Sequence, residues 1–145
     1  MANWYGTSRS NYFKVKDADA FVADMAKYGI DHTSADDGTT FAVFGGDEGY
    51  WPSEVWGGES IFCDEKWSEH FDAVQFDIIE VIMPHLRDNE VCVLQSAGAE
   101  KLRYVTGTAQ AFTNKKIISI DIDDIYALAA KKFKVPVADI SLAQY

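Results

Sequence analysis

The chain contains few cysteines and prolines, and it has no long run of apolar residues. Its 145 residues include two cysteines and three prolines. Both Cys63 and Cys92 lie in short apolar segments, and two cysteines are too few for a structural zinc site, so we expect reduced core residues. No apolar run approaches the roughly eighteen residues of a transmembrane helix, and the first residues lack the apolar region of a signal peptide. The sequence therefore predicts a cytoplasmic protein that does not bind membranes.

Basic residues are absent from the whole segment 28–65. The formal net charge is −10, and residues 31–90 hold most of the acidic excess. Segment 28–65 contains nine acidic residues: Asp31, Asp36, Asp37, Asp47, Glu48, Glu54, Glu59, Asp64 and Glu65. A negative field repels the phosphates of nucleic acids and attracts basic protein surfaces. We therefore expect no direct binding of DNA or RNA.

Motifs for cofactors, metals and catalysis are also missing. The glycine-rich "GGDEG" follows an expected strand, but its acidic residues would repel phosphate and no capped helix follows it. The three histidines do not occur at metal-ligand spacing, and "DIDD" at 121–124 is typical of a helix N-terminus. We predict no cofactor, no metal and no catalytic residue, and hence a protein that is not an enzyme.

Hydrophobic periodicity predicts a single α+β domain over residues 1–145. Alternating or compact apolar patterns predict a mostly antiparallel sheet of about five or six strands, and helical spacing predicts three helices. The expected strands cover residues 11–17, 39–44, 60–63, 90–95, 101–112 and 115–121. The expected helices cover residues 18–28, 69–86 and 123–133.

Capping residues and apolar stripes define how these helices should pack. Asp17 and Gly29 are expected to begin and end the first helix. Ser68 is expected to cap the central helix, with Pro84 closing or kinking it near its end. In the last helix, the apolar residues are expected to face the core: Ile125, Leu128, Ala129 and Phe133.

The segment "GGDEGYWPSEVWGGES", residues 45–60, is the candidate binding site. It combines acidic residues with tryptophans, which are enriched at protein interfaces, and it leads into a helix with further acidic residues. The candidate partner-binding residues are Asp47, Glu48, Trp51, Glu54, Trp56, Glu59, Glu69, Asp72 and Glu80. The tryptophans either point outward to a partner or fold back to cover an edge of the sheet.

The same segment admits an enzymatic alternative. Glycoside hydrolysis requires two carboxyl groups at a defined separation, and Tyr50, Trp51 and Trp56 could line a sugar cleft. With twenty-three acidic residues in the chain, several carboxylate pairs are expected by chance. A carboxylate-dependent hydrolase is therefore retained as an alternative to a binding protein.

Three segments carry a resemblance to known proteins: "MANWYGTSRSNYFKVKD", "GAEKLRYVTGTAQAF" and "DIYALAAKKF". Together they resemble small acidic proteins of unassigned function carried on bacterial plasmids, phages and integrative elements. Small acidic proteins of such elements often inhibit host defence, as anti-CRISPR proteins and DNA mimics do. The resemblance brings no catalytic motif.

Charge and resemblance together predict an acidic, protein-binding inhibitor. The expected partner is the basic surface of a nucleic-acid-binding protein or nuclease complex, whose groove the acidic residues would occupy. An immunity protein that neutralises a basic toxin nuclease has the same composition and remains open beside it.

Overall fold

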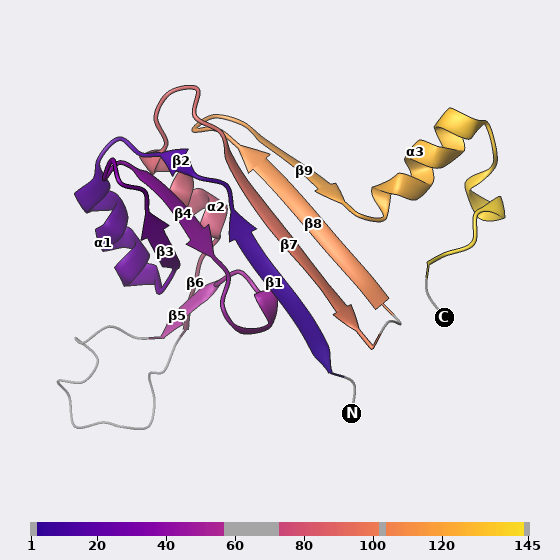
Figure 1. The fold of residues 1–145 in the computed structure, drawn as a ribbon, viewed down its shortest axis with the longest axis horizontal. Helices are drawn as coiled ribbons and strands as arrows, with labels where there is room; N and C mark the ends of the chain where they lie inside the picture. The colour runs from indigo at the N-terminus through magenta and orange to yellow at the C-terminus, as the bar shows by residue number, and fades with distance from the viewer. Residues whose placement is uncertain (1–2, 57–72, 102–103, 144–145) are drawn as a thin grey trace.

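An antiparallel sheet of seven strands is the main element of the protein, for which a computed structural model describes residues 3–56, 73–101 and 104–143. The strands are β1 (Trp4–Ser10), β2 (Phe13–Lys14), β3 (Asp31–Ser34), β4 (Thr40–Phe44), β7 (Cys92–Glu100), β8 (Tyr104–Phe112) and β9 (Ile117–Asp121). Their order is β2-β4-β1-β7-β8-β9, and β3 pairs with the other edge of β4 (Figure 1). A separate hairpin joins β5 (Glu54–Trp56) to β6 (Ala73–Gln75). The α+β class with a mostly antiparallel sheet is confirmed.

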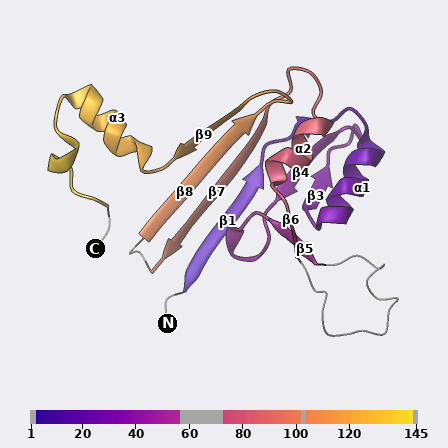
Figure 2. The same ribbon diagram turned by 180° about the vertical axis from the view of Figure 1, so that it is seen from behind.

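Three α-helices accompany the sheet in the described residues. They are α1 (Ala18–Tyr28), α2 (Ile78–Ile82) and α3 (Asp124–Phe133), and the single 3₁₀ turns are η1 (Asp47–Gly49), η3 (Met83–His85) and η4 (Val137–Asp139). Helices α1 and α2 lie at one end of the sheet, whereas α3 extends from the opposite end (Figures 1 and 2). Membrane crossing requires a longer apolar helix than any that the described residues form.

The hydrophobic core of the described residues lies at the end of the sheet that α1 and α2 cover. Phe21 and Met25 are four residues apart on α1, so both face the sheet and are fully buried. The core consists of Phe13, Val15, Phe21, Met25, Ile30, Phe41, Val43, Ile78, Ile79, Ile82, Leu86, Cys92, Leu94 and Phe112. Burial raises the pKa of the Cys92 thiol, so this cysteine is a free, protonated core residue as predicted. Cys63 lies outside the described residues.

The boundaries of α1 confirm the sequence prediction. The Asp17 carboxylate accepts hydrogen bonds from the backbone N–H groups of Asp19 and Ala20, at 3.0 and 3.1 Å. Gly29 ends the helix with a φ of 64°, a left-handed conformation that glycine adopts without steric cost. Both caps could be predicted because they depend only on local chain geometry.

The prediction of one central helix over residues 69–86 is wrong. Residues 73–75 form β6, with Val74 opposite Val55 of β5, and the helix begins only at Ile78. Asp77 caps it, through a 2.9 Å hydrogen bond from the N–H of Ile79 to the carboxylate. The apolar residues from Val74 onward fit strand alternation as well as helical spacing, and pairing with β5 decides the outcome. The expected cap Ser68 and the expected strand 60–63 lie outside the described residues.

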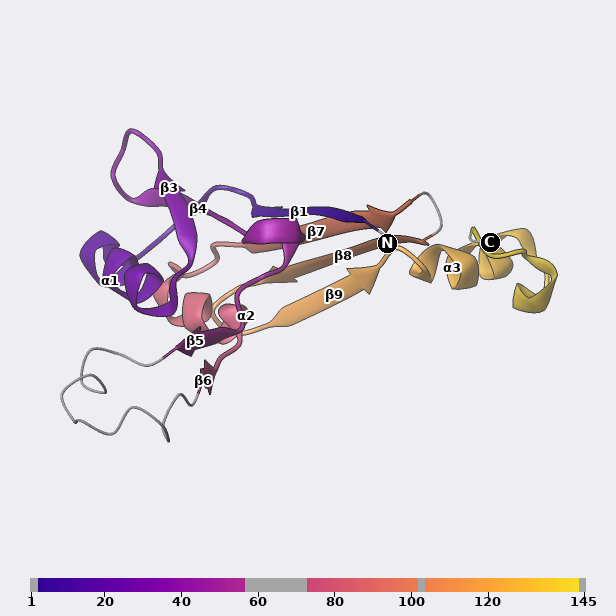
Figure 3. The same cartoon turned by 90° about the horizontal axis from the view of Figure 1, so that it is seen from below.

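The prediction that the apolar stripe of α3 faces the core is also wrong. The exposed fractions of Ile125, Leu128 and Phe133 are 58%, 61% and 71%. Figure 3 shows why, since α3 extends beyond the end of the sheet, away from α1, α2 and the described strands. The helix itself and its boundaries agree with the prediction, because an amphipathic pattern gives the type of element but not its packing partner.

The turn between β3 and β4 yields a first testable prediction. The carboxylate of Asp37 accepts hydrogen bonds from the Thr40 hydroxyl at 2.6 Å and from the N–H groups of Thr39 and Thr40. These bonds, the Thr40 hydroxyl first, lower the pKa of Asp37 from 3.8 to about 2. The stabilisation that follows is present above the unfolded-state pKa and is lost as the pH falls through about 2. We expect an NMR titration of Asp37 to give a midpoint near 2, and Thr40→Val to raise it; equal midpoints in both proteins would contradict this assignment.

Candidate functional site

Residues 45–53, which connect β4 to β5, form a loop that packs on β1. The N–H of Gly45 donates to the carbonyl of Ser8 at 3.1 Å, and the indole N–H of Trp4 donates to the carbonyl of Glu48 at 2.9 Å. Gly49 has a φ of 77°, and a Cβ atom there would lie 2.3 Å from the Thr7 nitrogen. The glycines therefore allow a close approach between two backbones.

This loop forms one wall of a groove of about 320 Å³. Three carboxylates from separate segments line it: Asp31 at the start of β3, Asp47 in η1 and Glu54 at the start of β5. The strand register places Asp31 directly opposite Phe44, the last residue of β4, which also lines the groove. Folding thus brings together acidic residues that are up to twenty-three positions apart in the sequence. We call this site the acidic groove.

Aromatic side chains complete the acidic groove. Tyr50 is 61% exposed and stacks on Trp4, with 6.3 Å between the ring centroids. Trp51 is half-buried and packs against the hydrophobic core while also lining the groove. The sequence left open whether Trp51 points outward to a partner or folds back onto the sheet. In the structure Trp51 does both in part, since it packs against the core and also lines the groove.

The acidic groove has an unbalanced negative charge. Its lining includes no Lys or Arg, and the described part of the chain supplies no ion-pair partner to its three carboxylates. Glu54 accepts one hydrogen bond from the Gln75 amide at 3.0 Å, which orients the carboxylate without neutralising it. Such a site attracts cationic groups over roughly one Debye length, about 10 Å at 0.1 M salt.

The structure assembles part of the predicted set of binding residues. Asp47, Trp51 and Glu54 line the acidic groove, whereas Glu48 and Glu80 are exposed outside its lining. The backbone of Trp56 pairs with Ala73 in the β5–β6 hairpin, but its side chain is outside the described part. The remaining predicted residues, Glu59, Glu69 and Asp72, also fall outside the described residues.

The sequence did not indicate Asp31 or Phe44 as groove residues, and it indicated Tyr50 only for the alternative sugar cleft. Asp31 was counted only as part of the charge of segment 28–65, and the signal that could have found it is the β3–β4 pairing. Because β3 pairs with β4 in antiparallel register, its first residue, Asp31, lies opposite Phe44 and beside the loop that follows β4. The turn at Asp37–Gly38 indicated this hairpin, but its register depends on tertiary packing.

The acidic groove does not have the arrangement of a metal site. Within residues 3–56, 73–101 and 104–143, no three His, Cys, Asp or Glu side chains are grouped as metal ligands. The lining combines these carboxylates with the aromatic residues Tyr50 and Trp51. This arrangement suits the binding of a larger cationic group.

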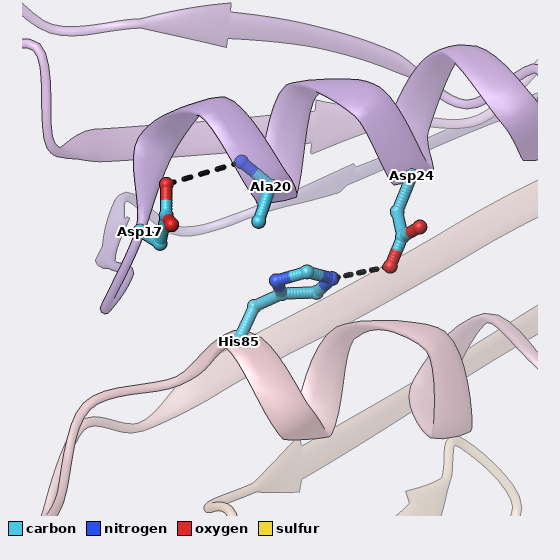
Figure 4. Close-up of polar contacts among 4 residues, drawn as sticks. All are labelled: Asp17, Ala20, Asp24 and His85. Atoms are coloured by element: carbon cyan, nitrogen blue, oxygen red, sulfur yellow. Dashed lines mark hydrogen bonds and ion pairs between the residues drawn. The ribbon is translucent and has the colours of Figure 1, made fainter.

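A second polar contact, between His85 and Asp24, has the residue types of an acid–base pair. The imidazole Nε2 of His85 donates to the Asp24 carboxylate at 2.6 Å, which joins η3 to α1 (Figure 4). The ring also lies edge-on to Phe21, with 5.5 Å between centroids. No hydroxyl or thiol in the described part of the chain hydrogen-bonds to His85, so the pair lacks a nucleophile. Its evident role is to hold α1 against η3.

The chain was compared with protein-family models, with curated proteins and with solved structures, and none of the three comparisons gave a match. The resemblance to proteins of bacterial mobile elements therefore stays a prediction. Inference about function depends on the geometry and the charge of the chain itself.

Proposed function

We propose that the protein is an acidic, protein-binding inhibitor of a nucleic-acid-handling protein. The observation that carries the proposal is the acidic groove, which Asp31, Asp47 and Glu54 line from three segments and whose described lining includes no Lys or Arg. A host defence nuclease complex, as in inhibition by anti-CRISPR or DNA-mimic proteins, is the partner class that fits the resemblance. The protein would bind through the groove and cover the partner's basic surface.

The chemistry of the acidic groove favours an Arg or Lys side chain as its occupant. A guanidinium group can pair with carboxylates and stack on aromatic rings at the same time. Tyr50 offers an exposed ring beside these carboxylates, and cation–π contacts add about 0.5–1 kcal/mol at exposed sites. An Arg-rich surface would therefore be preferred over a Lys-rich one.

Inhibition would follow from competition with nucleic acid. Nucleases and CRISPR effectors hold phosphate backbones with Lys and Arg side chains, and those same side chains would pair with the acidic groove. The formal net charge of −10 adds long-range attraction to such a surface. A salt-dependent association rate is expected as a result.

Charge reversal in the acidic groove tests this function. The immobilised full chain and its Asp47→Lys/Glu54→Lys variant are used to capture proteins from a bacterial lysate at low and high salt, with mass spectrometry of the bound proteins. We expect the wild type to retain a nuclease or effector at low salt. The amount that the variant captures should be at least tenfold lower, because the introduced lysines repel a basic partner. A captured toxin nuclease in place of a defence nuclease would identify an immunity protein.

A matched control separates the groove from the overall charge. The variant Asp36→Lys/Asp139→Lys changes the net charge by the same amount at two exposed positions outside the groove lining. This control is expected to retain the partner nearly as well as the wild type. Equal capture by all three proteins would disprove electrostatic binding, and equal loss in both variants would disprove the acidic groove as the site.

A further inference from the structure

The C-terminal part of the chain leaves a large apolar surface uncovered. All five residues of the edge strand β9 are exposed, and Ile118 and Ile120 on one of its faces are 69% and 63% exposed. On α3, Leu128 and Phe133 are exposed to 61% and 71%. Extended apolar surfaces of this kind on a small protein mark interaction sites.

The face of the sheet that carries the β9 isoleucines forms a shallow trough of about 460 Å³ over β1, β7, β8 and β9. Small residues line its middle, where Ala97 lies opposite Gly107 and Ala109 lies opposite Ile120. Ile120 and Ile122 form its rim on the β9 side. Because alanine and glycine leave the backbone accessible, a helix can pack closely against the sheet in this trough. We call it the alanine trough.

Helix α3 has the complementary shape and chemistry. Its apolar residues Ile125, Leu128 and Phe133 recur at helical spacing and form one stripe, all of it exposed. The helix has ten residues and is about 15 Å long, enough to cross several strands of a sheet. An isolated helix of this length is marginal in water and gains its stability from packing of the apolar stripe.

The connection to β9 prevents α3 from packing into the alanine trough of its own chain. Only Ile122 and Asp123 separate the strand from the helix. The N–H of Asp121 donates to the Asp124 carboxylate at 2.8 Å, and the N–H of Ile122 donates to the carbonyl of Gly107 at 2.7 Å. These bonds fix a tight turn that directs α3 away from the sheet (Figures 1 and 3). Among the described residues, the apolar stripe of α3 is therefore left exposed.

We propose that two copies of the chain form a symmetric dimer in which α3 of each copy lies in the alanine trough of the other. A twofold arrangement buries both stripes and both troughs with the same pair of surfaces. Charge supports a second copy as the occupant, since residues 100–145 contain seven basic and five acidic residues, whereas residues 1–99 contain six and eighteen. The lysines at the end of α3, Lys131, Lys132 and Lys134, would then approach a second copy whose residues 1–99 carry a net negative charge.

The dimer and the inhibitory function are separate proposals. The acidic groove lies between β3, η1 and β5, and none of its lining residues lines the alanine trough. A dimer would present two acidic grooves to a partner, which raises avidity without any new contact. A monomer in solution would leave the groove proposal intact.

Sedimentation velocity of the full chain at 5–100 µM, as a suitable range, tests the dimer. The wild type is expected to sediment as a dimer in the upper part of this range, and Leu128→Glu as a monomer because it places a charge in the trough. Lys115→Glu, which changes an exposed residue in the β8–β9 turn, is the control and should remain dimeric. A wild-type protein that stays monomeric at every concentration would overturn the proposal. The same holds if this monomer binds anionic vesicles through α3, since the stripe would then have a different occupant. A dimer that Leu128→Glu leaves intact would also overturn the proposal.

Cross-linking tests the same contact without depending on the stability of a variant. In a Cys63→Ser background, a copy with Ala109→Cys is mixed with a copy with Leu128→Cys and oxidised mildly. The mixture is expected to form a disulfide-linked dimer between the two different copies. In the control, Lys115→Cys takes the place of Leu128→Cys, and the yield of cross-linked dimer should be at least tenfold lower. Equal yields from both pairs would overturn the placement of α3 in the alanine trough.

Discussion

Replacing Phe21 with alanine is expected to lower the free energy of unfolding by about 3–5 kcal/mol, as for other large aromatic core residues. Phe21 is fully buried where α1 meets the sheet, and its ring packs on Phe41 at 4.8 Å, on Phe13 at 5.7 Å and on His85 at 5.5 Å between centroids. The truncation leaves a cavity in the hydrophobic core at the end of the sheet that α1 and α2 cover. Urea denaturation followed by far-UV circular dichroism measures the change.

The neighbouring residue Val22 provides the control for this substitution. It lies on the same helix but is 39% exposed, and Val22→Ala improves helix propensity while it removes little buried surface. We expect a change below about 1 kcal/mol. If the two variants unfolded at the same urea concentration, the core would not be centred on Phe21 as the structure describes.

Replacing Gly49 with alanine is expected to detach the acidic loop from β1 or to destabilise the protein by about 2–4 kcal/mol, from backbone strain together with overpacking. The Cβ atom would lie 2.3 Å from the Thr7 nitrogen and 2.5 Å from the carbonyl carbon of Gly6. Both are backbone atoms that cannot move aside as a flexible side chain would. The indole N–H resonance of Trp4 reports the loop directly, because this group donates to the Glu48 carbonyl.

Gly38 supplies a closely matched control for Gly49. Both glycines have a positive φ, 68° and 77°, but a Cβ atom at Gly38 meets nothing within 4 Å. Gly38→Ala should therefore cost only the conformational strain, about 1–2 kcal/mol, and leave the Trp4 resonance unchanged. An equal loss of stability in both variants would contradict the close packing of the acidic loop on β1.

The sequence allowed correct prediction of features that depend on neighbouring residues. Asp17 and Gly29 define α1 because each cap acts within a few residues of the chain. The pairing of β8 with β9 follows equally from local sequence, since the two strands are adjacent in the chain and joined at Thr113–Asn114. The charge of segment 28–65 was predictable for the same reason, as it requires only counting.

Features that depend on distant residues were not predictable in this way. The residues before Asp77 form a strand because β5 is available for pairing, and the apolar pattern alone does not reveal that partner. The stripe of α3 was assigned to the core because amphipathic helices usually cover their own domain, whereas a rigid two-residue turn directs this one outward. The acidic groove combines Asp31 with Asp47 and Glu54 only through the register of β3 on β4.

The two ends of the molecule therefore have different chemical properties and different proposed roles. The end near β3, η1 and β5 has a negative groove with exposed aromatic rings, which suits a cationic partner. The end formed by β9 and α3 is apolar and carries lysines, which suits a second copy of the chain. Both roles require the body of the sheet as a rigid support between them.

The most direct test of the central claim is the footprint of the captured partner on the protein. Amide hydrogen exchange, read by mass spectrometry, is compared between the full chain alone and the full chain in complex with that partner. We predict increased protection at residues 45–56 and around Asp31, the segments that form the acidic groove. Protection confined to β9 and α3, with residues 45–56 unchanged, would contradict the claim that the acidic groove binds the partner.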